Sequence, residues 1–70
     1  MSHRKTFGAN LRASRVAKGL TQEQLARKCK VTSDYISMLE HGRANVGLDN
    51  IVKIAKGLRI PIAELIKGIE

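Results

Sequence analysis

The chain has 70 residues, with 13 Lys and Arg against 6 Asp and Glu, and its net charge is +7 at neutral pH. A chain of this length forms at most one small domain, which leaves little material for a catalytic cleft with its own supporting shell. The hydrophobic fraction of 43% argues against disorder, and the positive charge favours polyanionic partners such as nucleic acid.

The sequence also argues against several other kinds of site. Cys29 is the only cysteine, and a small buried hydrophobe is the interpretation that fits it best. Residues 1–5 lack the apolar stretch of a signal peptide, and no run approaches the ~18 apolar residues of a membrane span. We therefore expect a cytoplasmic protein with no metal, cofactor, membrane contact or evident small-molecule ligand.

The first predicted helix covers roughly residues 4–18. Phe7 and Leu11 recur there at helical spacing and are candidates for the core. Gly19 follows directly, and a glycine at this point supplies the left-handed residue that commonly closes a helix.

The second predicted helix follows Thr21 and runs to about residue 29. Gln24 stands three residues after Thr21, which is the capping-box pattern of a helix start. Leu25 and Ala26 are its expected core residues. A third helix, residues 33–40, is predicted after Thr32, a good N-cap residue.

The remaining helix-breaking residues divide the rest of the chain into two further predicted helices. Residues 43–47 form a loop before a helix over about 48–56, and Pro61 is expected to open a fifth helix at its first position, over about 61–67. The predicted fold is all-α, a compact five-helix bundle in a single domain over residues 1–70. Apolar residues recur at helical spacing through the fourth helix and just beyond it: Leu48, Ile51, Ile54, Ala55 and Leu58.

The second and third helices are joined by only residues 30–32, a connection short enough to hold them at a steep angle. Residues 21–40 therefore form a candidate helix-turn-helix. Ile36 and Leu39 are expected to face the core. The other side chains of the third helix are then left to face outward, toward base edges in a DNA major groove: Ser33, Asp34, Tyr35, Ser37 and Met38.

These segments resemble the Cro/repressor-type (XRE-like) helix-turn-helix family, the lambda-repressor-like DNA-binding domains. The resemblance rests on Gly-Leu-Thr-Gln-Glu-Gln-Leu-Ala at 19–26, Val-Thr at 31–32, Tyr-Ile-Ser-Met-Leu-Glu-His-Gly-Arg at 35–43, and Leu-Asp-Asn-Ile-Val-Lys-Ile-Ala at 48–55. Tyr35 and the Asn-Val-Gly-Leu stretch at 45–48 are also similar to the controller proteins of restriction–modification systems, a subset of that family.

The resemblance implies roles for individual residues. Ala26 would lie where the two helices cross, and Arg15 and Glu40 match an ion pair that braces the recognition helix. The residues at base-reading positions are Ser33, Asp34, Ser37 and Met38, with Tyr35 on a thymine methyl or the backbone. The residues at phosphate-contacting positions are Gln22, Thr32, Arg43 and Asn45.

Two residues depart from the family pattern. Lys30 occupies a turn position where many members have Gly, and a left-handed Lys costs on the order of 1 kcal/mol, which the motif tolerates. Asp34 carries a carboxylate that repels phosphate. It either accepts a hydrogen bond from a cytosine amino group or serves only as a favourable charge at the helix N-terminus.

The fifth helix suggests a homodimer, since most single helix-turn-helix modules double their contacts with a symmetric partner. Leu65 suffices for the core, which leaves Ile62, Ile66 and Ile69 for the partner. The alternative is that all four pack inward.

The sequence thus predicts a transcriptional regulator, repressor-like in type, that binds double-stranded DNA sequence-specifically. An enzyme is disfavoured because the serines lack a glycine elbow and the two histidines join no catalytic group. The alternative is a protein-interaction module on the same scaffold, such as an antitoxin or coactivator-like domain, because fold alone does not distinguish the two.

Overall fold

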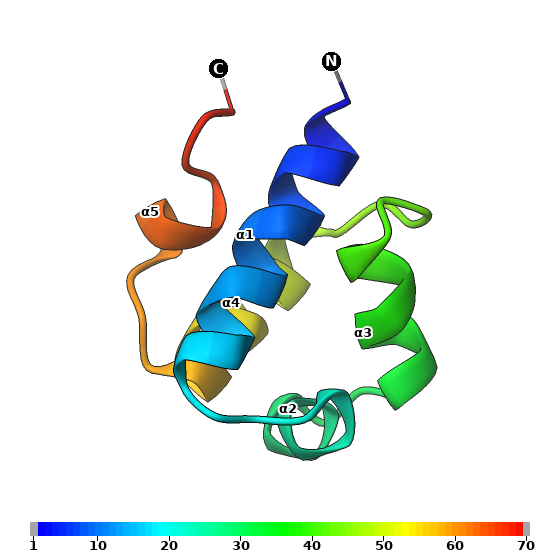
Figure 1. Cartoon of the computed structure of the whole chain (residues 1–70), viewed down its shortest axis with the longest axis vertical. Helices are drawn as coiled ribbons and strands as arrows, with labels where there is room; N and C mark the ends of the chain where they lie inside the picture. The colour runs from blue at the N-terminus through cyan, green and yellow to red at the C-terminus, as the bar shows by residue number, and fades with distance from the viewer. Residues whose placement is uncertain (1, 70) are drawn as a thin grey trace.

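The computed structural model describes residues 2–69, and in that range it contains five α-helices and no strand. They follow in the order α1 (His3–Ala17), α2 (Gln22–Cys29), α3 (Ser33–Glu40), α4 (Leu48–Leu58) and α5 (Ile62–Leu65). The predicted all-α fold is therefore confirmed. In Figure 1, α1 crosses in front of α4, with α3 to one side, α5 to the other and α2 beneath.

The helix starts use the side chains that the sequence indicated. The backbone N–H of Gln24 donates to Thr21 Oγ1 over 3.0 Å, and the N–H of Thr21 donates to Gln24 Oε1 over 2.9 Å. This is the predicted capping box, which satisfies two otherwise unpaired donors. At the next helix start, the N–H of Tyr35 donates to Thr32 Oγ1 over 3.1 Å.

Helix ends adopt left-handed backbone at both glycine and non-glycine residues. Gly19, which follows the C-cap residue Lys18 of α1, has φ of 71°, as expected of a glycine that closes a helix. Lys30 has φ of 59°, so the short turn between α2 and α3 keeps its geometry without the usual glycine. Arg59 ends α4 in the same conformation, with φ of 56°, and no sequence signal predicts it.

The core is aliphatic apart from Phe7 and Cys29, and all five helices contribute to it. α1 packs against α3 and α5, while α2 packs against α3 and α4. No polar or charged residue among those described is buried. The fully buried large side chains are Leu11, Leu25, Ile36, Leu39, Ile54, Leu58 and Leu65.

Gly8 permits the closest approach between two helices. A Cβ at this position would lie 2.3 Å from the Leu39 carbonyl oxygen and 2.7 Å from that of Glu40. Only a residue without a side chain lets the backbone of α1 meet the last turn of α3 at this distance. Gly8 therefore sets where α3 sits on the domain.

Three expectations about the C-terminal half are corrected. Leu48 does not face the core: it is 73% exposed at the first position of α4, beyond the reach of the packed helices. Helix α5 is a single turn over Ile62–Leu65, and Pro61 precedes it as the N-cap in extended conformation. Ile69 packs against the core of its own chain, whereas the sequence assigned it to a partner.

Among residues 2–69, no helix is long and apolar enough to cross a membrane.

Candidate nucleic-acid interface

Two buried residues pack helix α3 against the core, and the rest of its surface faces outward. Ile36 is fully buried and Leu39 is 1% exposed, so both hold the helix on the core. Asp34 and Met38 are exposed, and Ser33 and Ser37 are half-buried at the edges of the same face. This face offers hydroxyls, a carboxylate and a thioether.

Tyr35 differs from the expectation that it faces outward. Its ring is half-buried against the core cluster, and its hydroxyl accepts a hydrogen bond from Asn50 Nδ2 over 2.9 Å. Asn50 lies in the first turn of α4, so this bond ties α3 to α4. Because the hydroxyl accepts from Asn50, its own proton stays free to donate.

The first turn of α2 lies beside the first turn of α3. A shallow hollow between them is lined by residues from α1, α2 and α3, among them Gln22, Ser33 and Ser37. The Gln22 amide Nε2 donates to Glu40 Oε1 over 3.2 Å, so its side chain is oriented from within the protein.

The ion pair between Arg15 and Glu40 is present and joins α1 to the end of α3. Arg15 Nε donates to Glu40 Oε2 over 2.6 Å, and Nη2 donates to Oε1 over 3.0 Å. The two side chains are only 13% and 3% exposed. Hydrogen bonding to the Glu40 carboxylate raises the pKa of Arg15 above its ordinary value, although burial opposes the rise.

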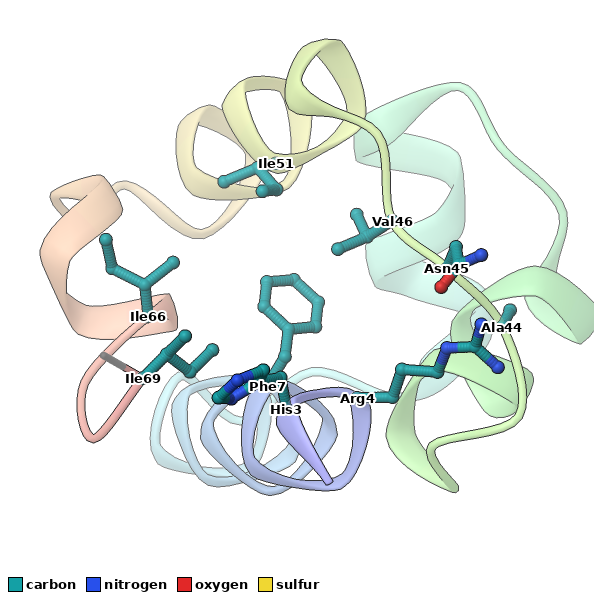
Figure 2. Close-up of a pocket in the computed structure, with 9 residues that line it drawn as sticks. All are labelled: His3, Arg4, Phe7, Ala44, Asn45, Val46, Ile51, Ile66 and Ile69. Carbon is teal, nitrogen blue, oxygen red and sulfur yellow. The ribbon is translucent and has the colours of Figure 1, made fainter. Parts of the chain in front are cut away.

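Three other predicted contact residues lie at the two ends of α3. Thr32 is its N-cap, Arg43 and Asn45 lie in the loop after it, and all three are exposed. Figure 2 shows a hollow between this loop, α1, α4 and the C-terminal segment, with the Arg4 side chain extending from α1 toward Ala44 and Asn45. Arg4 thus adds a cation beside the loop that the family pattern did not single out.

Of the residues expected at a dimer interface, two are available. Ile62 is 39% exposed and Ile66 is 40% exposed, which is high for large apolar side chains. Ile69 is half-buried and lines the hollow of Figure 2 together with Phe7 and Ile51, and Ile66 lies at the same hollow. Within residues 2–69 the structure contains no group of three or more side chains able to hold a metal ion.

Comparison with known sequences identifies related regulators. The helix-turn-helix family model (HTH_3) matches residues 11–65. The control protein C.BamHI of Bacillus amyloliquefaciens is 42% identical over 64 residues, covering 90% of this chain and 79% of that protein. A hypothetical transcription factor from Neisseria meningitidis is 40% identical over 63 residues, covering 90% of this chain and 59% of that protein.

Solved structures give the same result. The restriction–modification controller protein C.AhdI from Aeromonas hydrophila has a TM-score of 0.87 and 44% identity, covering 89% of this chain and 90% of that one. The clp gene regulator ClgR from Corynebacterium glutamicum has a TM-score of 0.89 and 32% identity, covering 93% and 84%. The predicted resemblance to repressor-type and controller proteins is confirmed.

Proposed function

This chain belongs to the helix-turn-helix (HTH_3) family, and from that membership we propose that it is a transcriptional regulator that binds double-stranded DNA sequence-specifically. The observation that carries the proposal is the way in which α3 is held on the core. Two buried residues and a poorly exposed ion pair fix this helix, while its other face stays polar and accessible. One α-helix of this kind fits the major groove of DNA.

Base reading falls to the outward face of α3. Ser33 and Ser37 present hydroxyls that donate or accept, and Met38 offers an apolar contact for a thymine methyl. Asp34, exposed in the first turn, suits a cytosine amino group. For Tyr35 the bond from Asn50 favours a backbone contact, because the free hydroxyl proton can be donated to a phosphate.

Phosphate contacts come from the two ends of the motif. Gln22, in the first turn of α2, lies where unpaired backbone N–H groups also attract an anion. Thr32 keeps a hydroxyl proton to donate, since its oxygen accepts from Tyr35 N–H. Arg43 and Asn45 hold the next phosphates from the loop, with Arg4 beside them.

We propose that the protein acts as a homodimer on an inverted repeat. Ile62 and Ile66 are exposed next to the buried Leu65, and they form the apolar surface that a symmetric partner would cover. We further propose that residues 1–70 act as one domain, cytoplasmic like its DNA target, and that it is not an enzyme.

The test is selection from a random double-stranded DNA pool at about 150 mM salt, where non-specific phosphate contacts are weakened. Sequencing of the retained fragments is expected to show an enriched inverted repeat, and the mass of the complex is expected to match two chains per duplex. A folded protein that enriches no sequence would contradict the proposal and favour the protein-interaction module.

A further inference from the structure

On one face of the domain, the charged side chains around two hollows are all positive. Two adjoining hollows there share Lys28 and Gly57, and they lie where the C-terminal part of α2 meets α4. Among the described residues no acidic side chain lines either hollow. All six cationic residues that line them are exposed, and we call this surface the lysine face: Lys18, Lys28, Lys30, Lys53, Lys56 and Arg59.

The lysine face is distinct from the surface proposed to contact the operator. The hollow between the first turns of α2 and α3 shares no lining residue with it. Helix α2 separates the two, since Gln22 from its first turn lines one and Lys28 from its last turn lines the other. In Figure 1, α4 lies behind α1, whereas α3 stands to the side.

Helix geometry accounts for only part of this charge. Lys28 and Lys56 occupy the last turns of α2 and α4, where the helix dipole favours a cation. Lys53 lies in the middle of α4, one turn before Lys56, so two like charges lie on one side of the helix, and Asp49 one turn earlier offsets only part of their repulsion. The ion pairs within residues 2–69 involve other residues. A bound polyanion would remove the repulsion.

The composition of the lysine face indicates the kind of polyanion. Protein interfaces are depleted in Lys and rely on aromatic or apolar anchors. The large apolar side chains exposed on residues 2–69 lie outside this face. The face also has no aromatic ring on which unpaired bases would stack. The face therefore offers positive charge but no group that would recognise a particular base or side chain. Such a surface suits the phosphate backbone of a DNA duplex.

We propose that the lysine face is a second, sequence-independent DNA-binding surface, which holds the backbone of a second duplex while α3 occupies the operator. The operator complex in this statement rests on the proposed function, but the charge and composition of the face do not. The consequence for regulation is that one protein can bring two DNA segments together.

The test uses the full chain saturated with an unlabelled operator duplex obtained from the selection above. A labelled, unrelated duplex of about 20 base pairs is then added, and its fluorescence anisotropy is followed as salt increases. We expect capture of the labelled duplex by the wild-type protein. The Lys53→Gln/Lys56→Gln variant should bind it at least about tenfold more weakly, with the salt slope reduced by about 2.

The matched control is Arg12→Gln/Lys67→Gln, which removes the same charge from exposed residues outside the lysine face. It should capture the labelled duplex within about twofold of wild type, and both variants should retain operator affinity. Equal weakening by the two variants, or no capture by the wild-type complex, would overturn the proposal. Displacement of the duplex by polyglutamate at equal charge would also overturn it, in favour of an acidic protein partner.

The unliganded chain separates this proposal from the proposed function. If no operator is ever selected but the unrelated duplex still binds in a manner that depends on Lys53 and Lys56, the lysine face stands and the role of α3 fails. If operator binding is normal but binding of the unrelated duplex does not depend on Lys53 and Lys56, only the proposal for the lysine face is wrong.

Discussion

Arg15 and Glu40 lie 25 residues apart in sequence, yet the guanidinium of Arg15 donates two hydrogen bonds to the carboxylate of Glu40, over 2.6 and 3.0 Å. A third donor of Arg15, Nη1, reaches the Leu20 carbonyl oxygen over 2.8 Å, and Glu40 also accepts from Gln22. The pair therefore connects α1, the turn before α2, α2 itself and the end of α3. It fixes the orientation of the proposed recognition helix relative to the rest of the domain.

Glu40→Gln should lower the free energy of unfolding by about 3 kcal/mol, because it leaves the poorly exposed Arg15 charge without its counterion. Urea denaturation measures this change. The double variant Arg15→Met/Glu40→Gln should recover most of the loss, since no unpaired charge remains. A single-variant loss below about 0.5 kcal/mol would show that the pair behaves like an exposed one.

Gly8→Ala should destabilise the domain by about 2–3 kcal/mol, because the added Cβ would press against the carbonyl oxygens of Leu39 and Glu40. Thermal unfolding measures the effect. Gly47→Ser is the matched control. Gly47 is the N-cap of α4 and has no side-chain cap, and a Cβ there would meet nothing within 4 Å. It should stabilise by a few tenths of a kcal/mol. Equal effects at the two glycines would contradict the close approach of α1 and α3.

Asn10→Ala should loosen the C-terminal segment. Asn10 Nδ2 donates to the Leu65 carbonyl oxygen over 2.9 Å and to that of Lys67 over 2.8 Å, which holds the end of α5 on α1. Loss of both bonds should cost about 1–2 kcal/mol. Hydrogen exchange should quicken at Ile66 and Ile69, whose N–H groups are bonded in this segment. Unchanged exchange there would show that apolar packing alone holds α5.

Cys29 predicts a pH dependence of stability. Burial raises the pKa of its thiol above the ordinary value of 9.0, with Lys53 opposing the rise. The unfolded chain therefore releases this proton at lower pH than the folded one, and stability is lost as pH rises past 9.0. The Cys29→Ala variant has no thiol and does not lose stability in this way. The difference in free energy of unfolding between wild type and variant should therefore shrink between about pH 8 and pH 10. A constant difference across that range would show that the thiol titrates alike in both states.

Features of the fold that depend on neighbouring residues were predictable from the sequence. The Thr21 and Gln24 cap, the Thr32 cap and the left-handed Lys30 are each set by a few consecutive residues. Ile36 and Leu39 followed from helical spacing, because α3 has only one face against the core.

Features that depend on how distant helices meet were not predictable. Helical spacing placed Leu48 on the apolar face of α4, but it does not say where along the helix the covering elements end. The contact of Gly8 with α3, the bond from Asn50 to Tyr35 and the bonds from Asn10 to the C-terminal segment all join separate elements. Tyr35 was predicted to face outward but is half-buried, because it contacts α4, a separate element.

The most direct test of the central claim is a parallel selection with wild type, Ser37→Ala and Arg43→Ala. Ser37 faces the proposed groove, so its loss should change base preference at one symmetric pair of positions, by about 1–3 kcal/mol for the affected base. Arg43→Ala should weaken all sequences about equally and reduce the salt slope by about 1. If Ser37→Ala enriched the same sequence with the same preferences as wild type, and so did a Ser33→Ala variant, α3 would not be the element that reads the DNA.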